Sequence, residues 1–356
     1  MHDVLAPGGG GGQEPVAGTL VAAAHDVAAR VLAPTAEETD RAPIVPSSHL
    51  DALAAAGLFG LSCPPAAPLP ATREIFEALS GACGVTFFVW VQHHAPVRML
   101  AGSANHALRD RHLPDLCSGR VLGGVAFAYL RRPGPPVVVA RRVPGGYRID
   151  GEAPWVTSWG LAGLYSVAAR LDDRVLYFLT EPTASAQMRP SAPLALAAMG
   201  ASSTVRLTFD GLFVPEDDLL ATMDFEDWQA RDRAATAWPN PAAFGIAATC
   251  IRLLAESAGH SAGALAEQID DCRRRSYGLA DTGRTDAAHL EAQVDARAES
   301  LALAVRAATA LVVSAGGQGM ASGHPAQRLL REAAFFTIQA QTPALRRATL
   351  AQLTRS

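Results

Sequence analysis

Lysine is absent from this chain of 356 residues, and arginine provides all 30 of its basic side chains. We attribute this bias to GC-rich codon usage rather than to a binding surface. The 34 acidic residues are interspersed with the arginines, and the net charge is −4. Without a basic stripe, nucleic acid and anionic membranes are excluded as expected partners. The glycine run at 8–12 has neither a lysine nor a following helix signature, which excludes a phosphate-binding loop.

Cysteine is scarce. The five cysteines are odd in number, widely spaced and without a CxxC pair: Cys63, Cys83, Cys117, Cys250 and Cys272. This pattern argues against a disulfide framework and against a cysteine zinc site. It favours a reducing compartment, because cytosolic thiols stay reduced.

Metal and hydrolase motifs are also missing. His260, His289 and His324 have no HxxxH or similar ligand spacing, so we expect no metal site. Ser158 does not lie in a Gly-x-Ser-x-Gly elbow, so we expect no hydrolase triad around it.

Long apolar runs are absent. No run approaches the roughly 20 apolar residues that cross a bilayer. Residues 1–15 lack the basic and apolar regions of a secretory signal. We therefore predict a flexible tail at 1–15 and a cytoplasmic protein without a membrane partner.

Hydrophobic residues, in contrast, make up 49% of the chain, enough for large cores. Residues 16–119 have helical periodicity and predict an N-terminal helical domain. Ser47 or Ser48 is the expected N-cap of its second helix, and Gly57 and Gly60 are expected to end that helix.

Short β-branched runs, with turns at 144–146, 172–173 and 210–211, predict six or more strands within residues 120–222. Residues 223–356 return to helical periodicity, and Gly316 and Gly317 end the longest predicted helix. The predicted fold is α+β and multi-domain: an N-terminal α-helical domain, a middle β-barrel or β-sandwich domain and a C-terminal α-helical bundle.

Three strings, in this order along the chain, resemble acyl-CoA dehydrogenases. They are YRIDGEAPWVTSWGLAGLYSVAA, VRLTFDGLFVPEDDLL and SAGGQGMASGHPAQRLLREA. The order of helical, β and helical domains is also that of this family. The resemblance implies an acyl-CoA dehydrogenase-like fold, FAD as the cofactor and a homodimer or homotetramer.

The resemblance also implies a flavin site, whose ring would lie along the end of one strand. The residues carried over to that strand are Trp155, Val156, Thr157 and Ser158. Backbone groups of a second segment would face the ring, although Pro135 and Pro136 replace the family's Gly-Ser turn there. The residues of this second segment are Tyr129, Leu130 and Arg131.

A glycine-rich turn completes the implied cofactor site. Gly316, Gly317 and Gly319 allow close backbone approach to a phosphate or adenosine group. A simple helix C-cap is the alternative interpretation of the same glycines.

The family's catalytic base is missing from the sequence. In these dehydrogenases a glutamate removes the α-proton of an acyl thioester. Ala340, in the string TIQAQTPALRR, stands in its place. The other place used in the family, the start of the first C-terminal helix, reads AWPNPAAFG and has no carboxylate either.

The C-terminal bundle is predicted to be about one helix shorter than usual. The missing part includes an Arg-x-x-Phe-Gly turn that contacts the FAD pyrophosphate across the dimer. In another alignment Arg274, Tyr277 and Gly278 stand in for this turn. If the turn is lost, FMN becomes an alternative cofactor.

Two-component flavin monooxygenases, a related branch, need no α-proton base and receive reduced flavin from a reductase. Similarity to them implies that His93 or His94 is catalytic, by donating a hydrogen bond to a peroxide or deprotonating a phenol. The alternative is that one histidine caps a helix and the other is solvated.

Three functions follow from these resemblances. The first is a flavin-dependent oxidoreductase without the usual glutamate, acting on a small organic or acyl-thioester substrate, with an electron-transfer protein as its partner. The second is a two-component flavin monooxygenase that uses O2 and depends on a flavin reductase. The third is a catalytically degenerate relative that assembles with another subunit.

Overall fold

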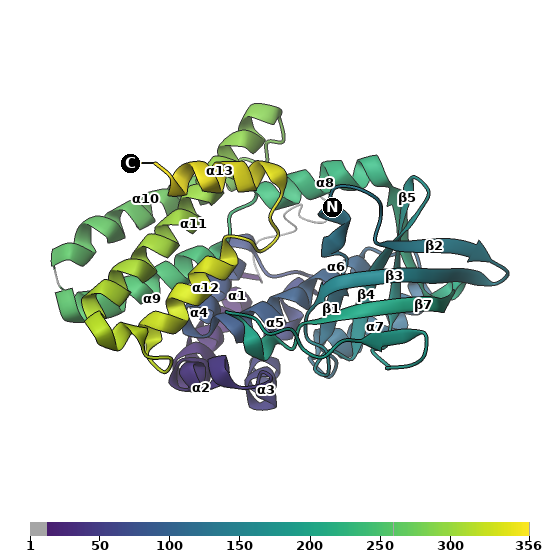
Figure 1. Ribbon diagram of the computed structural model, residues 1–356, viewed down its shortest axis with the longest axis horizontal. Helices are drawn as coiled ribbons and strands as arrows, with labels where there is room; N and C mark the ends of the chain where they lie inside the picture. The colour runs from purple at the N-terminus through teal and green to yellow at the C-terminus, as the bar shows by residue number, and fades with distance from the viewer. Residues whose placement is uncertain (1–12, 259, 356) are drawn as a thin grey trace.

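The computed structural model describes residues 13–258 and 260–355. Helices α1–α7 come first, strands β1–β8 form the middle part, and helices α8–α13 follow. The sheet lies at one end of the molecule and the C-terminal bundle at the other (Figure 1). The predicted order of helical, β and helical parts is confirmed. Of the predicted tail, residues 1–12 lie outside the described residues, and α1 begins at Gln13.

The N-terminal part is a set of short helices. The α-helices are α1 (Gln13–Val27), α2 (Ala36–Arg41), α3 (Ser47–Ala55), α4 (Leu69–Ala82), α5 (Gly84–Gln92), α6 (His94–Ala101) and α7 (His106–Cys117), with the short helical turns η1 (Ala28–Leu32), η2 (Ala33–Thr35) and η3 (Leu58–Ser62). Gly57 follows α3 with a φ of 72°, as predicted for a helix end. The predicted serine N-cap was wrong, because Pro46 occupies that position and no side chain caps the helix.

The middle part is one connected sheet of eight strands in the order β6-β7-β3-β2-β4-β5-β8, with β1 beside β4. The strands are β1 (Gly123–Ala126), β2 (Val138–Val143), β3 (Gly146–Val156), β4 (Leu164–Leu171), β5 (Arg174–Thr180), β6 (Met188–Pro190), β7 (Val205–Pro215) and β8 (Leu219–Asp224). The predicted turns at Gly145 and Asp172 join β2 to β3 and β4 to β5, and both residues have positive φ. The predicted turn at 210–211 was wrong, because β7 continues through it as a bulge.

The C-terminal part is a helical bundle: α8 (Phe225–Ala237), α9 (Pro241–Ala258), α10 (His260–Asp281), α11 (Ala287–Ala315), η7 (Gly316–Met320), α12 (Pro325–Phe336) and α13 (Pro343–Leu353). α11 packs against α9, α10, α12 and α13. The stretch Ala287–Met320 is long and apolar enough to cross a membrane. The expectation that no stretch meets this criterion was therefore wrong, although four packed neighbours mark α11 as the central helix of the bundle.

Charged side chains join α12 to the N-terminal helices. Arg328, only 4% exposed, donates to Glu332 Oε2 at 2.9 Å and to Glu37 Oε1 at 3.1 Å. Glu332 Oε1 accepts the N–H of Gly84 at 3.1 Å. Arg331 pairs with Asp40 on α2. We call these six residues, three from the N-terminal helices and three from α12, the α12 junction: Glu37, Asp40, Gly84, Arg328, Arg331 and Glu332.

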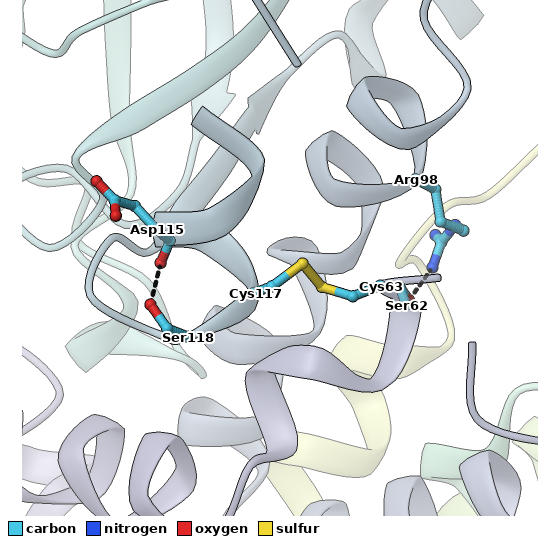
Figure 2. Close-up of a disulfide and its surroundings, with 6 residues drawn as sticks. All are labelled: Ser62, Cys63, Arg98, Asp115, Cys117 and Ser118. Atoms are coloured by element: carbon cyan, nitrogen blue, oxygen red, sulfur yellow. Dashed lines mark hydrogen bonds between the residues drawn. A yellow bond between two sulfur atoms is a disulfide. The ribbon is translucent and has the colours of Figure 1, made fainter. Parts of the chain in front are cut away.

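A disulfide joins Cys63, after η3, to Cys117, the last residue of α7 (Figure 2). Their Cα atoms lie 5.9 Å apart, a separation that suits a disulfide. The expectation drawn from the cysteine pattern was wrong for this pair, because spacing along the chain does not report distance in the fold. Cys83, Cys250 and Cys272 are free and buried. The cytoplasmic location stays a prediction.

Candidate functional site

Strained backbone gathers at the end of β3. Trp155 and Ser158 have φ values of 62° and 68°, and Met199 and Ser203 of the facing loop have φ values of 61° and 49°. The Ser158 N–H donates to the Ser202 carbonyl at 2.9 Å, which joins the two segments. Non-glycine residues in this region are uncommon and cluster at functional sites. The end of β3 is therefore a candidate site on backbone geometry alone.

Only one of the four residues predicted along the flavin ring is exposed. The Trp155 side chain is 58% exposed, beside an irregularity in the pairing of β3 with β7. Val156, Thr157 and Ser158 are buried. The Thr157 hydroxyl lies 3.1 Å from that of Thr204, and its carbonyl accepts a hydrogen bond from Tyr165. The buried Ser158 hydroxyl has no partner in the part of the chain that the structure describes.

This end of β3 lies where the three parts of the molecule meet. The facing loop includes the turn η5 (Gly200–Ser202), which packs against α2 and α5. The same loop receives a hydrogen bond from Arg331 of α12 at the Ala197 carbonyl, at 3.2 Å. A ligand beside Trp155 would therefore be near all three parts.

The second predicted flavin segment is a helical turn, η4 (Ala128–Arg131), rather than a strand. Tyr129 and Leu130 are buried, and the Tyr129 hydroxyl donates to the Ala168 carbonyl at 2.5 Å. Arg131 makes a bidentate ion pair with Asp232 of α8, at 2.7 and 2.9 Å. These side chains are engaged within the protein, so a cofactor contact would fall to the backbone of this turn.

A buried arginine that the sequence reasoning missed joins two loops. Arg297 of α11 is 6% exposed. Its Nη1 donates to the carbonyls of Thr236 and Trp238 at 3.0 and 3.1 Å, and its Nη2 to the Gln339 carbonyl at 3.4 Å. The loops are 238–240 and 337–342, which include the two places where the resemblance would put a catalytic glutamate. Burial, together with the positive charge of Arg131, lowers the pKa of Arg297 to about 10.

One sequence signal could have found this arginine. Arg297 lies four residues before Leu301 and seven before Ala304, both of which are buried. These spacings place all three on one face of α11. A charge in the apolar stripe of a helix requires a partner in the fold, and the pattern alone does not say which.

The two candidate catalytic histidines are fully buried. His93 Nδ1 accepts the N–H of Gly123 at 2.9 Å, and its ring contacts Phe59. His94 packs between Trp90 and Phe76, and neither of its ring nitrogens has a partner among the described residues. Burial lowers the pKa of His93 to about 4 and that of His94 well below its usual value. Both rings are therefore neutral near pH 7, and neither reaches the surface of the chain as folded.

The glycine-rich turn lies away from the end of β3. Gly316 has a φ of 58° directly after α11, which is the geometry of a helix end. Gly317 is exposed and Gly319 is buried. The turn between α11 and α12 lies at the end of the bundle away from the sheet (Figure 1). Within one chain, the fold does not bring these glycines to Trp155.

No group of three or more possible metal ligands occurs among residues 13–258 and 260–355. Two of the histidines considered from the sequence have structural hydrogen bonds instead. His289 Nε2 lies 2.9 Å from the Leu279 carbonyl, and His324 caps α12 by accepting the N–H of Ala326.

Sequence comparisons find similarity to acyl-CoA dehydrogenases. Residues 17–120 match the family described as acyl-CoA dehydrogenase, N-terminal domain. The chain is 26% identical over 312 residues to 2-methylacyl-CoA dehydrogenase of Solanum tuberosum, which covers 78% of this chain and 73% of that protein.

Two solved structures share the fold over nearly the whole chain. Butyryl-CoA dehydrogenase from Megasphaera elsdenii superposes with a TM-score of 0.79, at 20% identity, covering 96% of this chain and 98% of the other. Dibenzothiophene monooxygenase from Paenibacillus sp. A11-2 superposes with a TM-score of 0.76, at 17% identity, covering 94% and 96%. The chain therefore resembles acyl-CoA dehydrogenases in sequence over residues 17–120 and shares the fold of these two structures over nearly its whole length.

Proposed function

We propose that this protein is a flavin-dependent oxidoreductase whose active site works without the usual glutamate. Its substrate would be an acyl thioester or another small organic molecule. The observation that carries the proposal is Arg297, whose guanidinium joins the loops at Trp238 and Gln339. A buried cation there disfavours a proton-abstracting carboxylate, because an ion pair holds a carboxylate in its charged, weakly basic form.

The end of β3 suits a flat cofactor. Trp155 offers an exposed aromatic face, and the strained backbone from Trp155 to Ser158 is already ordered by the facing loop. Val156 and Thr157 would support the ring from beneath, and the backbone of η4 would approach its edge. FAD is the proposed cofactor and FMN the alternative. Once bound, a flavin would supply a centre that accepts or donates two electrons.

A second copy of the chain completes this proposal. Because the turn at Gly316, Gly317 and Gly319 lies away from Trp155 within one chain, it would meet the far end of a flavin held by a partner subunit. This arrangement requires at least a homodimer, and a homotetramer satisfies it too. An electron-transfer protein would then remove electrons from the reduced cofactor.

Monooxygenation is the second candidate. The fold shared with dibenzothiophene monooxygenase, at a TM-score of 0.76, favours it. The lack of a carboxylate at Ala340 favours it as well, because this chemistry needs no α-proton base. A flavin reductase would be the partner. His93 or His94 would act only if the N-terminal helices open, since both rings are fully buried.

Flavin binding is the first test. We expect the purified chain to retain FAD or FMN, identified by chromatography after denaturation. Trp155→Ala should weaken binding about tenfold, since an aromatic contact contributes up to about 1.5 kcal/mol. Phe213→Ala, an exposed aromatic side chain on β7, is the matched control and should bind normally. A chain that binds no flavin under any condition would leave the third function, a catalytically degenerate assembly partner.

Reaction type is the second test. The flavin-loaded protein is mixed anaerobically with butyryl-CoA, and loss of oxidised flavin absorbance supports dehydrogenation. In parallel, reduced flavin, ¹⁸O₂ and a small phenol are supplied, and mass spectrometry follows incorporation of ¹⁸O into the product. Incorporation without anaerobic bleaching would reject the dehydrogenase and establish the monooxygenase.

A further inference from the structure

Two buried hydrogen-bond donors lie without partners in neighbouring parts of the bundle. Arg297 Nε and Asn240 Nδ2 are both inaccessible to solvent and lack an acceptor among the described residues. Asn240 Oδ1 is engaged, because it accepts the N–H of Ala242 at 3.2 Å. Asn240 is also two residues from Trp238, whose carbonyl accepts a hydrogen bond from Arg297. A buried donor without an acceptor is unfavourable, because it has lost its hydrogen bonds to water.

The charge at this place is uncompensated. Arg131 lies close enough to affect the pKa of Arg297, but Asp232 neutralises Arg131 with a bidentate ion pair. Arg297 makes no ion pair with a carboxylate of the described residues. Carbonyl oxygens satisfy three of its hydrogen bonds without cancelling its charge. Burying a cation in this way is unfavourable unless an anion joins it.

The two loops above Arg297 are only partly buried. Trp238 and Pro239 of the first loop are half-buried, as are Gln339 and Ala340 of the second. Ala340 contributes only a methyl group. A small ligand that enters between these loops would approach the Trp238 and Gln339 carbonyls, to which Arg297 donates. Gln293, one turn before Arg297 on α11, has a buried amide oxygen without a partner. Rotation of this amide would offer a third donor.

We propose that Arg297 and Asn240 form an anion-binding site for a negatively charged oxygen of the substrate, either a carboxylate or an enolate. The site rests on the proposed function, since it lies at the loops where the family has its base. In place of a group that removes a proton, the chain has donors that stabilise negative charge on oxygen. The substrate class is therefore an organic acid or an acyl compound that enolises.

Thermal unfolding of the purified full-length chain tests this site without flavin or turnover. Sodium butyrate is the probe, butyramide is its neutral isostere, and ionic strength is held constant. We expect saturating butyrate to raise Tm by about 1–3 °C, because a ligand that binds only the folded state stabilises it. Butyramide should give no rise. An equal response to both compounds, or to neither, would overturn the proposal.

Variants locate the effect. Arg297→Met should abolish the Tm rise, and Arg297→Lys should weaken butyrate binding several-fold in calorimetry while keeping some response, since lysine retains the charge but not the planar set of donors. Arg189→Gln removes an equal charge from an exposed position and should respond like the wild type. If Arg297→Met does not fold, the lysine variant decides. Unchanged affinity in the lysine variant would assign Arg297 a purely structural role.

These outcomes are separable from those of the proposed function. Butyrate binding without flavin binding would retain the anion site and reject the oxidoreductase. Flavin binding and turnover without a butyrate response would retain the oxidoreductase and reject the anion site.

Discussion

Two buried arginines of the C-terminal bundle differ in one respect. Arg328 donates to two carboxylates, Glu332 and Glu37, so the charge in the α12 junction is balanced. Arg297 is buried equally well but, within the described part of the chain, donates only to main-chain carbonyls. The charge of Arg328 is neutralised by carboxylates of the same chain, and these ion pairs hold α12 against the N-terminal helices. The charge of Arg297 is not neutralised by a carboxylate, so this arginine can still bind an anionic ligand. This difference separates a structural arginine from a candidate functional one.

The largest expected effect lies in the α12 junction. Arg328→Met leaves Glu332 buried without its cation, so we expect a loss of about 3–5 kcal/mol in the free energy of unfolding. Denaturant titration measures this loss. Arg306→Met, an exposed position on α11, is the control and should change stability by less than about 0.5 kcal/mol. Adding Glu332→Leu to Arg328→Met should recover part of the loss. A single variant as stable as the wild type would remove the distinction between the two arginines.

The contribution of the disulfide to stability can be compared with that of the α12 junction. The disulfide links two segments within the N-terminal helices, whereas the α12 junction joins these helices to the C-terminal bundle. Cys63 and Cys117 close a loop with a sequence separation of 54 residues. Replacing both by serine should lower the free energy of unfolding by about 2–4 kcal/mol. Reductant should cause a similar loss in the wild type and none in the double variant. Equal sensitivity of both proteins to reductant would contradict the assignment.

His93 and His94, like Arg297, have buried nitrogen atoms without a hydrogen-bond partner among the described residues. The pH dependence of stability tests the effect of burying these two rings. The pKa of His93 is lowered to about 4 in the folded chain by burial, from an unfolded value near 6.5. The unfolded state therefore binds more protons between pH 6.5 and 4. Stability contributed by the neutral ring is present above pH 6.5 and is lost as pH falls toward 4.

We expect the wild type to lose about 2 kcal/mol through His93 between pH 7 and pH 5. Burial lowers the pKa of His94 as well, so this ring adds to the loss. His94→Phe suits the surrounding Trp90 and Phe76 rings and should make the pH dependence shallower, leaving the part that is due to His93. His106→Gln, at an exposed position, should leave it unchanged. Denaturant titrations at several pH values make the measurement. An unaltered slope in His94→Phe would show that this ring does not control acid stability.

The smallest expected effect comes from supplying the missing anion within the chain. Ala340→Glu places a carboxylate next to Gln339, whose carbonyl already accepts a hydrogen bond from Arg297. We expect a stabilisation of about 1 kcal/mol and loss of the butyrate response. The positive φ of Ala340 costs alanine and glutamate alike. Ala344→Glu, exposed on α13, is the control and should retain the rise in Tm with butyrate. If Ala340→Glu also retains that rise, the loop at Ala340 is not part of the anion site.

Local signals predicted the architecture well. Gly145 and Asp172 were recognised as turn residues, and both join antiparallel strands with positive φ. Gly211 was predicted to form a turn on the same grounds, but its positive φ belongs to a bulge within β7. There the Asp150 carboxylate accepts the Gly211 N–H at 2.7 Å, a contact that a neighbouring strand provides. A glycine reports that the backbone bends, but not whether the strand ends.

The candidate site was predictable only in part. The strand end at Trp155 was singled out from a string of neighbouring residues, and the structure exposes the indole there. Tyr129 was expected to face the flavin through its backbone, and it lies in a buried helical turn, where its hydroxyl donates to the Ala168 carbonyl of β4. His93 or His94 was expected to be catalytic, yet aromatic rings from three segments cover both histidines. In each case the error concerns what packs over a residue.

The sequence by itself determined the order of helices and strands, most of the turns and the absence of a carboxylate at Ala340, because propensity, periodicity and residue identity are local properties. Only the tertiary structure decided that Cys63 meets Cys117 and that Arg297 joins two loops without an anion. Those contacts connect residues 42 to 61 positions apart. Their formation depends on how whole helices pack, and no short window of sequence carries that information.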